Sequence, residues 1–361
     1  MNVLPNIDLA KDYMAALLSQ VDGNPAAMVS LARLICDRHR AIAVDLCTRA
    51  LELESKDGEV RATAAEVLSH GIPHWHVNIV RDQGRNHAYE SALQRAIVPG
   101  CKVLEIGTGT GLLAMMAARA GAGEVITCEA DPAIAMAARH IIALNGYADR
   151  VRVINKYSTE LDVESDLSGP ADLLVSEILA DDLLGEGTLP VLEHAYRHLL
   201  KPGAVILPAR GRVRVALAED DDWDHVRMGT VAGFDLSPFN RLAAPSREIF
   251  TGASRLTLRS DPADVFTFDF TSGGPFPVAR GETTLTASGR HINGIAQWIA
   301  LDMDASHTYE NRPEPGADSS WWAVFHPFDA PVILEPGARI KVHARHDRGS
   351  LRVWAELAAT S

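Results

Sequence analysis

The chain has 361 residues, of which 47% are hydrophobic and 22% are charged. This balance is typical of a globular protein with its own core, and the length favours about two domains. The formal net charge of −13 argues against non-specific binding to nucleic acid, which needs Lys and Arg to neutralise phosphates. A negative surface is compatible with a cationic substrate, although it also simply favours solubility.

Membrane, export and metal-binding segments are not expected. No run approaches the roughly 18 apolar residues that a membrane span needs, and the first residues lack the basic-then-apolar pattern of a signal peptide. The cysteines, Cys36, Cys47, Cys101 and Cys128, form no C-x-x-C pair, and neither His nor Cys has metal-ligand spacing. We therefore expect reduced thiols, no metal site and a cytoplasmic protein that contacts neither membranes nor nucleic acid directly.

Residues 1–77 are expected to be helical. Ala and Leu recur at helical spacing through residues 41–68, and the polar turn Glu54–Gly58 divides this pattern in two. The run resembles a tetratricopeptide unit, with small residues where two helices cross. One or two such units cannot bury both of their faces alone. The segment is therefore expected either to cap the rest of the chain or to dock a partner, and both roles stay open.

Residues 78–207 alternate short apolar strands with helices. The expected strands are Lys102–Ile106, Glu124–Cys128, Arg152–Asn155, Ala171–Ser176 and Ala204–Leu207, and the expected helices are Leu112–Arg119, Pro132–Asn145 and Val191–Leu200. The last helix is expected to end at Lys201-Pro202-Gly203. Alternation of this length predicts a parallel sheet with helices on both faces.

Residues 208–361 change to strand-like alternation punctuated by Gly and Pro, which predicts an antiparallel, barrel-like β domain. The expected strands are Arg212–Leu217, Val265–Phe270, Thr283–Ala287, Ile295–Asp302, Trp322–Phe325, Arg339–Ala344 and Ser350–Leu357. An acidic stretch, residues 219–223, interrupts the pattern on the way to Gly233-Phe234. We expect an arm near residues 219–245.

A glycine-rich turn carries the first functional prediction. Gly107, Gly109 and Gly111 follow an apolar strand and open a helix, so backbone can approach a ligand closely there. Glu129 ends the next expected strand, where a carboxylate can accept both ribose hydroxyl protons. A dinucleotide cofactor and a tight turn without ligand remain alternatives. The G-x-G-x-G spacing and the acidic Glu105 before it favour the S-adenosylmethionine site of a methyltransferase.

A second motif suggests the acceptor. The segment Ser176–Gly187, SEILADDLLGEG, resembles the "double-E" hairpin of the protein arginine methyltransferases. Together with VLEIGTGTGLLAMMAARAGA and VINKYSTE it is most similar to the type III branch, protein arginine methyltransferase 7, from about residue 78 to the C-terminus. The resemblance implies a class I, Rossmann-like methyltransferase domain followed by a β-barrel-like domain, and a homodimer formed through the arm.

The resemblance also implies roles for individual residues. Arg85 would pair with the methionyl carboxylate of the cofactor, Glu129 would hold the ribose, and the segment around Ser158 would lie near the adenine. Glu177 and Glu186 would grip the guanidinium of the substrate. Burying two carboxylates without their cation is costly, so at least one of them should have a raised pKa in the empty site.

Two departures from the family bear on the substrate. The family places tyrosines just before a segment that covers the cofactor, which residues 80–86 resemble here. This chain instead has Trp75, which is expected either to wall the site or to pack. In the loop of residues 316–322, Trp321 is expected to form an aromatic wall, but the family histidine that would pair with Asp82 has no counterpart. The acceptor is thus expected to be arginine in a protein or peptide, with free arginine or another guanidine metabolite as the alternative. An inactive scaffold that binds partners through its helical N-terminus is a third possibility.

Overall fold

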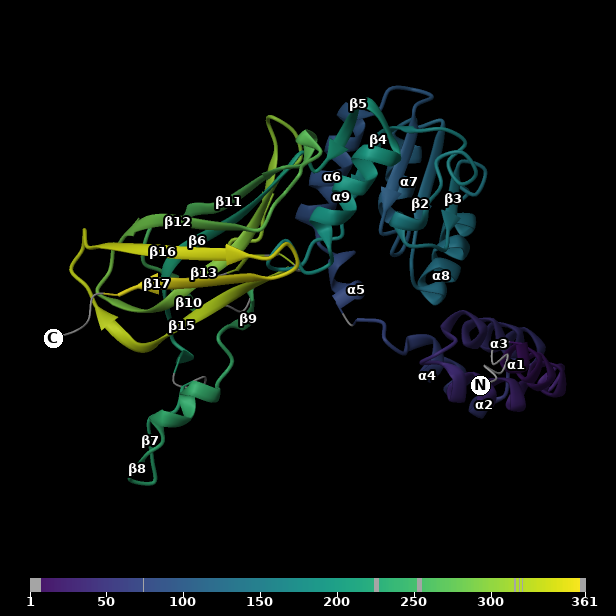
Figure 1. The fold of residues 1–361 in the computed structure, drawn as a ribbon, viewed down its shortest axis with the longest axis horizontal. Coiled ribbons are helices and arrows are strands. Elements are labelled where there is room, and N and C mark those ends of the chain that lie inside the picture. Colours follow the sequence, from purple (N-terminus) through teal and green to yellow (C-terminus); the bar gives the residue numbers. More distant parts are fainter. Residues whose placement is uncertain are drawn as a thin grey trace, which may run out of the picture.

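The structure is a computed structural model, and it describes residues 8–73, 75–223, 227–251, 255–314, 316–317, 319 and 321–357. Figure 1 shows three bodies, with the α/β body joined to a helical bundle near the N-terminus below it and to an elongated β body at its side. The bundle consists of α1 (Asp8–Val21), α2 (Pro25–Ile35), α3 (Arg40–Leu53) and α4 (Gly58–Ser69). These helices share their own buried apolar cluster.

Helix boundaries in the bundle follow from capping. Asn24 accepts a hydrogen bond from the backbone N–H of Ala27 and is followed by Pro25, which suits the first helical position. Asp57 caps α4 by accepting from the N–H groups of Glu59 and Val60. The turn expected at residues 54–58 therefore ends one helix and starts the next.

The α/β body contains a parallel sheet in the order β3-β2-β1-β4-β5. Its strands are β1 (Lys102–Ile106), β2 (Glu124–Cys128), β3 (Val151–Ile154), β4 (Ala171–Ser176) and β5 (Leu200–Leu207), and its helices are α5 (Trp75–Ile79), α6 (Gln83–Ala96), α7 (Leu112–Arg119), α8 (Pro132–Leu144) and α9 (Thr188–His198), with the short η1 (Ser158–Glu160). The strand order reverses between β1 and β4. Ligands of such sheets bind at this reversal, beyond the carboxyl ends of the strands.

The β body is antiparallel and has two main sheets. One has the path β10-β6-β13-β15-β9, with β11 on β6 and β14 on β13, and the other is β12-β16-β17. The strands are β6 (Arg210–Asp220), β9 (Arg247–Phe250), β10 (Leu256–Leu258), β11 (Ala263–Asp269), β12 (Ala279–Thr286), β13 (His291–Asp302), β14 (Thr308–Glu310), β15 (Trp322–Ile333), β16 (Arg339–His346) and β17 (Leu351–Glu356). The predicted fold class, α/β followed by an antiparallel β domain, is confirmed.

Within the α/β body, two elements, α9 and β5, differ from the sequence prediction by more than one residue. The last helix of the α/β body begins at Thr188 and ends at His198, and Lys201-Pro202-Gly203 lies inside β5 instead of in a turn. The pairing of β5 with β4 shifts register between Ala171 and Leu173, which accommodates these residues at the edge of the sheet. The short strands β9, β10 and β14 were not predicted, because three or four residues carry too little periodicity.

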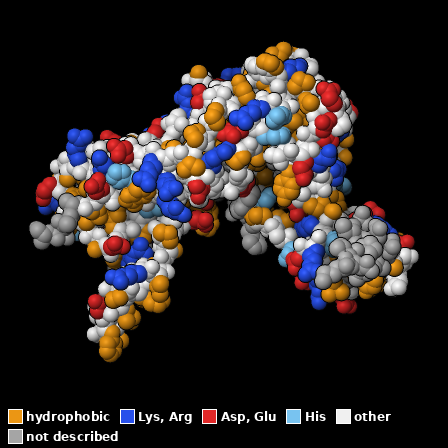
Figure 2. All heavy atoms as spheres, in the orientation of Figure 1, with side chains coloured by type: hydrophobic (Ala, Val, Ile, Leu, Met, Phe, Trp, Pro, Cys, Tyr) orange, Lys and Arg blue, Asp and Glu red, His pale blue; other side chains and the backbone are white. Residues whose placement is uncertain are grey.

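A projection extends from the β body between β6 and β9 (Figure 1). It contains the small hairpin of β7 (Thr230–Val231) and β8 (Phe234–Asp235), then η2 (Ser237–Leu242). Glu219 and Asp220, expected in the arm, belong instead to β6. Charged side chains such as Arg241 are exposed along it, and Figure 2 shows hydrophobic side chains at its tip. Its exposed large apolar residues are Met228, Val231, Phe234, Leu236, Phe239 and Leu242.

No helix within the described ranges is both long and apolar enough to cross a membrane.

Candidate active site

The glycine turn lies at the carboxyl end of β1 and is shaped by two tight contacts. Gly107 has φ +86°, and an added Cβ would lie 2.8 Å from Cγ2 of Ile178. Gly109 has φ +49° and faces open space. Gly111, at φ +78°, packs against Ile142 of α8 and does not line the adjoining cavity, so its role here is to let α7 start close to α8.

Glu129 follows β2 and faces the same cavity. Its Oε2 accepts a hydrogen bond from the N–H of Gly109 at 3.1 Å, and its Oε1 accepts from the N–H of Asp131 at 3.0 Å. Two backbone donors thus fix the carboxylate beside the glycine turn. Lys156, Tyr157 and Ser158 line the cavity as well, and Ser158 begins η1.

Two buried polar side chains in this cavity are incompletely paired. Nε of Arg85 and Oε2 of Glu105 have no hydrogen-bond partner, although the two residues are 4% and 1% exposed. Burial raises the pKa of Glu105 to about 8. Buried polar atoms normally find partners, so both atoms point to a polar ligand.

The double-E segment forms a closed loop between β4 and α9. The hydroxyl of Thr188 donates to the carbonyl of Ile178 at 2.6 Å and closes the loop. Asp182 Oδ1 accepts from the N–H groups of Leu184 and Gly185. These bonds hold Glu177 at the start of the loop and Glu186 near its end.

The loop is also anchored to the β body. The side-chain amide of Gln297 donates to the carbonyl of Asp181 at 3.0 Å, and the N–H of Trp322 donates to Asp181 Oδ1 at 3.2 Å. Behind Gln297, its Oε1 lies 3.3 Å from Nε2 of His326. Burial lowers the pKa of His326 to about 4, so this ring is neutral near pH 7.

Two cavities meet at the double-E loop. The first, of about 360 Å³, is lined by the glycine turn, Glu129 and the segment 156–158. The second, of about 490 Å³, is lined by Asn78, Leu179, Ala180, Asp181, Glu248, Trp321 and Trp322. Ile79, Glu177 and Glu186 line both. A group that moves from a ligand in the first cavity to one in the second passes these carboxylates.

Glu177 is buried and is paired with Arg85. Nη2 of Arg85 donates to Glu177 Oε2 at 2.6 Å. Burial nevertheless raises the pKa of Glu177 to about 7, and the attraction of Arg85 only partly offsets this rise. Glu186 lies at the surface, yet partial loss of water and the charge of Glu129 raise its pKa too. The expected penalty for two carboxylates without a substrate cation is therefore present.

Two further carboxylates line the second cavity. Asp181 and Glu248 both face it, and burial together with the charge of Glu248 raises the pKa of Asp181 to about 7. Among the described lining residues, no Lys, Arg or His side chain balances these charges. This cavity therefore favours cationic ligands.

Asp82 has a partner that the sequence did not indicate. Its Oδ1 accepts from the N–H of Arg85 at 2.8 Å and caps α6, and its Oδ2 accepts from the hydroxyl of Tyr309 at 2.5 Å. The Tyr309 hydroxyl lies 2.7 Å from Oγ of Ser319, and Ser319 also accepts from the N–H of Trp321 at 3.3 Å. Asp82 thus pairs with Tyr309, which in turn contacts Ser319, and no histidine is needed for this pairing.

Comparisons with known proteins identify the family of this chain. The Ribosomal protein L11 methyltransferase (PrmA) family model matches residues 90–208, which include the glycine turn and the double-E loop. An arginine N(omega)-methyltransferase of Streptomyces achromogenes subsp. streptozoticus is 39% identical over 294 residues, which are 80% of this chain and 80% of that protein. The chain belongs to the arginine N-methyltransferases. It is an enzyme that transfers a methyl group from S-adenosylmethionine to arginine.

Other arginine methyltransferases match the chain over different lengths. Protein arginine N-methyltransferase 7 of Oryza sativa subsp. japonica is 34% identical over 272 residues, but these are 68% of this chain and 37% of that protein. This chain therefore spans little more than a third of that relative.

Two solved methyltransferase structures share the fold. The Trypanosoma brucei PRMT1 enzyme–prozyme complex with AdoHcy has a TM-score of 0.66 and 21% identity, and it covers 80% of this chain and 98% of that one. Arabidopsis thaliana protein arginine methyltransferase 10 has a TM-score of 0.64 and 19% identity, and it covers 79% of this chain and 93% of that one. At these identities the likeness shows the fold alone.

The structure divides the site residues expected from sequence into those that line a cavity and those that do not. Arg85, Glu105, Gly107, Gly109, Glu129, Ser158, Glu177 and Glu186 line the first cavity, and Trp321 lines the second. Asp82 is 2% exposed and acts through Tyr309 and Arg85, and Gly111 lies behind the cavity wall. The side chain of Trp75 is outside the described residues.

Sequence reasoning missed the part of the site that depends on distant segments. Glu248, Tyr309 and Ser319 carry no local motif. From the β body, the structure brings Glu248 to the second cavity beside the double-E loop, and it brings Tyr309, with Ser319 behind it, to Asp82. The negative charge of Asp181 was visible within the hairpin, but its position beside Trp322 was not.

Proposed function

We propose that Glu177 and Glu186 hold the guanidinium of the substrate arginine where the two cavities meet, with the methyl donor in the first cavity and the acceptor in the second. The observation that carries this proposal is that both carboxylates line both cavities. Paired carboxylates suit a guanidinium because its planar fork donates charge-assisted hydrogen bonds in pairs. One terminal nitrogen then faces the methyl group.

The two glutamates lower the barrier chiefly by position and charge. A guanidinium has a pKa above about 12 and its lone pairs are delocalised, so it is a poor nucleophile. Carboxylates that draw positive charge to the other nitrogens leave electron density on the attacking one. That nitrogen forms its bond to the methyl carbon as the carbon–sulfur bond breaks, which leaves a neutral thioether. The methylated nitrogen then gives up a proton to a carboxylate.

The first cavity fits S-adenosylmethionine through its incompletely paired atoms. We assign the methionyl carboxylate to Arg85, whose Nε has no partner, and the ribose hydroxyls to Glu129. The adenine is assigned to the segment that includes Ser158, and Glu105, whose Oε2 has no partner, is assigned to a polar group of the cofactor. The cofactor supplies an activated methyl group, and these side chains orient it.

We propose arginine within a protein or peptide as the acceptor, preferably flanked by basic residues. The second cavity is lined by Glu177, Glu186, Asp181 and Glu248, without a cationic side chain among its described lining residues. The α-carboxylate of free arginine would enter this negative environment without a counter-ion. A peptide-bound arginine has no such carboxylate, and neighbouring Lys or Arg side chains would be attracted.

Free arginine is the second candidate. It is favoured by the Streptomyces relative, which is named an arginine N(omega)-methyltransferase without reference to a protein and matches 80% of this chain. The α-ammonium of free arginine would suit Asp181 or Glu248. The two candidates therefore differ in whether the second cavity accepts an arginine that carries a free α-carboxylate.

The test compares three acceptors with methyl-labelled cofactor: free L-arginine, Nα-acetyl-arginine N-methylamide, and an arginine peptide flanked by lysines. We expect kcat/KM to be highest for the peptide and lowest for free arginine. A peptide in which Lys replaces the acceptor Arg is the control. Label in free arginine alone would replace the first candidate by the second, and no label in any acceptor would contradict the proposed site.

We further propose a homodimer formed through the projection between β6 and β9. Support comes from its six exposed apolar residues, Met228, Val231, Phe234, Leu236, Phe239 and Leu242, since contiguous exposed apolar side chains often mark an interface. Light scattering of the purified chain should give twice the monomer mass. The Phe234→Asp variant should give the monomer mass, with Val98→Asp, at another exposed apolar side chain, as the control.

We propose a helical, tetratricopeptide-like domain of residues 1–77, a cofactor domain of residues 78–207 and a substrate domain of residues 208–361 with its arm. The separate apolar cluster of the bundle supports the first boundary. A cytoplasmic location is supported by the four cysteines, all of which are free.

A further inference from the structure

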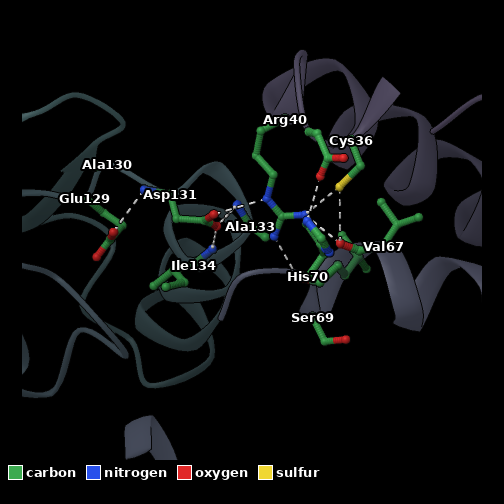
Figure 3. A network of polar contacts seen from close by, with 12 residues as sticks. Cys36, Arg40, Val67, Ser69, His70, Glu129, Ala130, Asp131, Ala133 and Ile134 are labelled. Atoms are coloured by element: carbon green, nitrogen blue, oxygen red, sulfur yellow. Dashed lines mark hydrogen bonds and ion pairs between the residues drawn. The ribbon is translucent and has the colours of Figure 1, made fainter. Parts of the chain in front are cut away.

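A single arginine connects the N-terminal bundle with the cofactor body. Arg40 is the first residue of α3, and Figure 3 shows its guanidinium between the bundle and the start of α8. On the bundle side, Nη1 donates to the carbonyl of Val67 at 2.5 Å and Nη2 to that of Leu68 at 2.9 Å. These carbonyls belong to the last turn of α4, where helices leave acceptors unsatisfied. On the other side, Nε donates to Asp131 Oδ2 at 3.1 Å.

Asp131 uses its remaining groups for the cofactor body. Its Oδ1 accepts from the N–H groups of Ala133 and Ile134 and so caps α8. Its backbone N–H donates to Glu129 Oε1 at 3.0 Å. A continuous chain of hydrogen bonds therefore runs from the end of α4 through Arg40 and Asp131 to the carboxylate beside the glycine turn (Figure 3).

This ion pair differs from the others of the bundle in its burial. The side chains of Arg40 and Asp131 are 19% and 27% exposed, whereas those of the Arg33–Glu66 pair are 63% and 66% exposed and 3.9 Å apart. Exposed pairs contribute little because water and salt screen them. A second contact supports the same junction, since the hydroxyl of Thr48 on α3 lies 2.9 Å from Sδ of Met136 on α8.

We propose that Arg40 is a positioning residue for cofactor binding: by holding Asp131 from the N-terminal bundle, it fixes the backbone that aims Glu129 at the ribose. This inference rests on the proposed placement of the ribose at Glu129. It gives the helical N-terminus a role within the enzyme itself, as a brace for the cofactor site. Arg40 contacts neither reactant, so its effect is on cofactor affinity and not on the chemical step.

The first measurement is the dissociation constant for S-adenosylmethionine, by calorimetry on the full chain. We expect Arg40→Ala to raise it about tenfold, the order of coupling within one hydrogen-bonded network. Arg33→Ala, which removes the exposed pair, should leave it unchanged. The kcat at saturating cofactor should stay within twofold of the unmodified enzyme, because the guanidinium-binding glutamates are untouched.

A second variant guards against a simple loss of folding, since Arg40→Ala also removes the partner of two α4 carbonyls. Asp131→Asn removes the charge but keeps a good N-cap side chain for α8 and leaves Arg40 on the bundle. It should raise the dissociation constant about as much as Arg40→Ala. In the double variant the two effects should not multiply, because they act through the same bond. If Arg40→Ala raises the dissociation constant by the same factor in the Asp131→Asn variant as in the unmodified enzyme, the proposal is overturned.

A cofactor analogue separates this inference from the proposed ribose site. With S-adenosylhomocysteine that lacks the ribose 2′-hydroxyl, the effect of Arg40→Ala should shrink, because Glu129 has lost part of what it binds. An undiminished effect would contradict a role through Glu129. If Glu129→Ala leaves cofactor affinity unchanged, the ribose placement itself is wrong. If Glu129→Ala weakens binding while Arg40→Ala and Asp131→Asn do not, the placement stands and the role of Arg40 is wrong.

Discussion

The two cavities that meet at Glu177 are assembled in different ways. Most of the wall of the first cavity, which we assign to the cofactor and call the cofactor cavity, comes from one continuous part of the chain, residues 105–158, which runs from β1 to η1. The second cavity, which we assign to the acceptor and call the acceptor cavity, is lined by four separate segments: α5, the double-E loop, β9 and the start of β15. A site made from neighbouring residues keeps its geometry through local turns, whereas one made from distant residues depends on how the α/β and β bodies pack together.

The largest expected effect is at the junction of the two cavities. Glu177→Gln keeps the shape of the side chain but removes its charge, and we expect kcat to fall about a thousandfold, in line with losing an electrostatic catalytic group. Cofactor affinity, measured by calorimetry, should change little. Loss of cofactor binding together with activity would show that Glu177 belongs functionally to the cofactor cavity.

On the cofactor side alone, Glu129→Ala should raise the dissociation constant for S-adenosylmethionine about 100-fold, because two hydrogen bonds to a charged acceptor are lost. The KM for the arginine acceptor should stay nearly constant at saturating cofactor. Glu124→Ala, at a half-buried carboxylate that starts β2 and pairs with Lys102 away from the cavity, is the matched control. A parallel loss of acceptor binding would mean that the cavities are less independent than their construction indicates.

The pH dependence of kcat/KM tests the role of Glu177, the buried carboxylate that lines both cavities. Burial raises the pKa of Glu177 to about 7, while Arg85 lowers it and the charges of Glu186 and Asp82 add to the rise. Only the ionised form pairs with a guanidinium, so kcat/KM should fall about tenfold per pH unit below pH 7 and level off above it.

Asp181, whose pKa is also raised to about 7, is the competing cause of such a profile. The Asp181→Asn variant should keep the inflection if Glu177 is responsible. Disappearance of the inflection in this variant would assign it to the acceptor cavity instead.

Tyr309→Phe tests the contact between the two bodies behind the site. It removes the hydroxyl between Asp82 and Ser319 and leaves a buried carboxylate oxygen of Asp82 with less hydrogen bonding. We expect the free energy of unfolding to fall by about 1–3 kcal/mol. The melting temperature checks this, with Tyr13→Phe at an exposed tyrosine as the control. An unchanged melting temperature would show that the contact contributes no stability.

The smallest effect is expected at the mouth of the acceptor cavity. Glu248 is exposed, and exposed charge pairs contribute at most about 1 kcal/mol, so Glu248→Gln should raise the KM of a lysine-flanked peptide by about threefold to fivefold. The KM of Nα-acetyl-arginine N-methylamide should not change, since it has no second cation. Equal effects on both acceptors would remove the support for a preference for basic neighbours.

The difference in how the two cavities are built explains which parts of the site could be predicted from the sequence. The glycine turn, Glu129 and the strands β1, β2 and β4 were predicted because each depends on periodicity or on residues close in the chain. The double-E loop was found through a family resemblance. Tyr309 is 227 positions from Asp82, and no local pattern connects them. Gly111 shows the limit of motif reading, because the same glycine spacing serves helix packing as well as ligand approach.

In the ion pair with Glu177, Arg85 presents the same chemical group, a guanidinium, that the substrate arginine carries. In the empty site one guanidinium already occupies the carboxylate that the proposed mechanism reserves for another. An incoming arginine therefore competes with, or displaces, a group of its own chemical kind. A ligand with a weaker or differently shaped cation, such as a lysine ammonium, meets the same competitor without the same planar fork. If Glu177 binds the substrate as we propose, Arg85 would favour acceptors whose cation can replace its own guanidinium on Glu177.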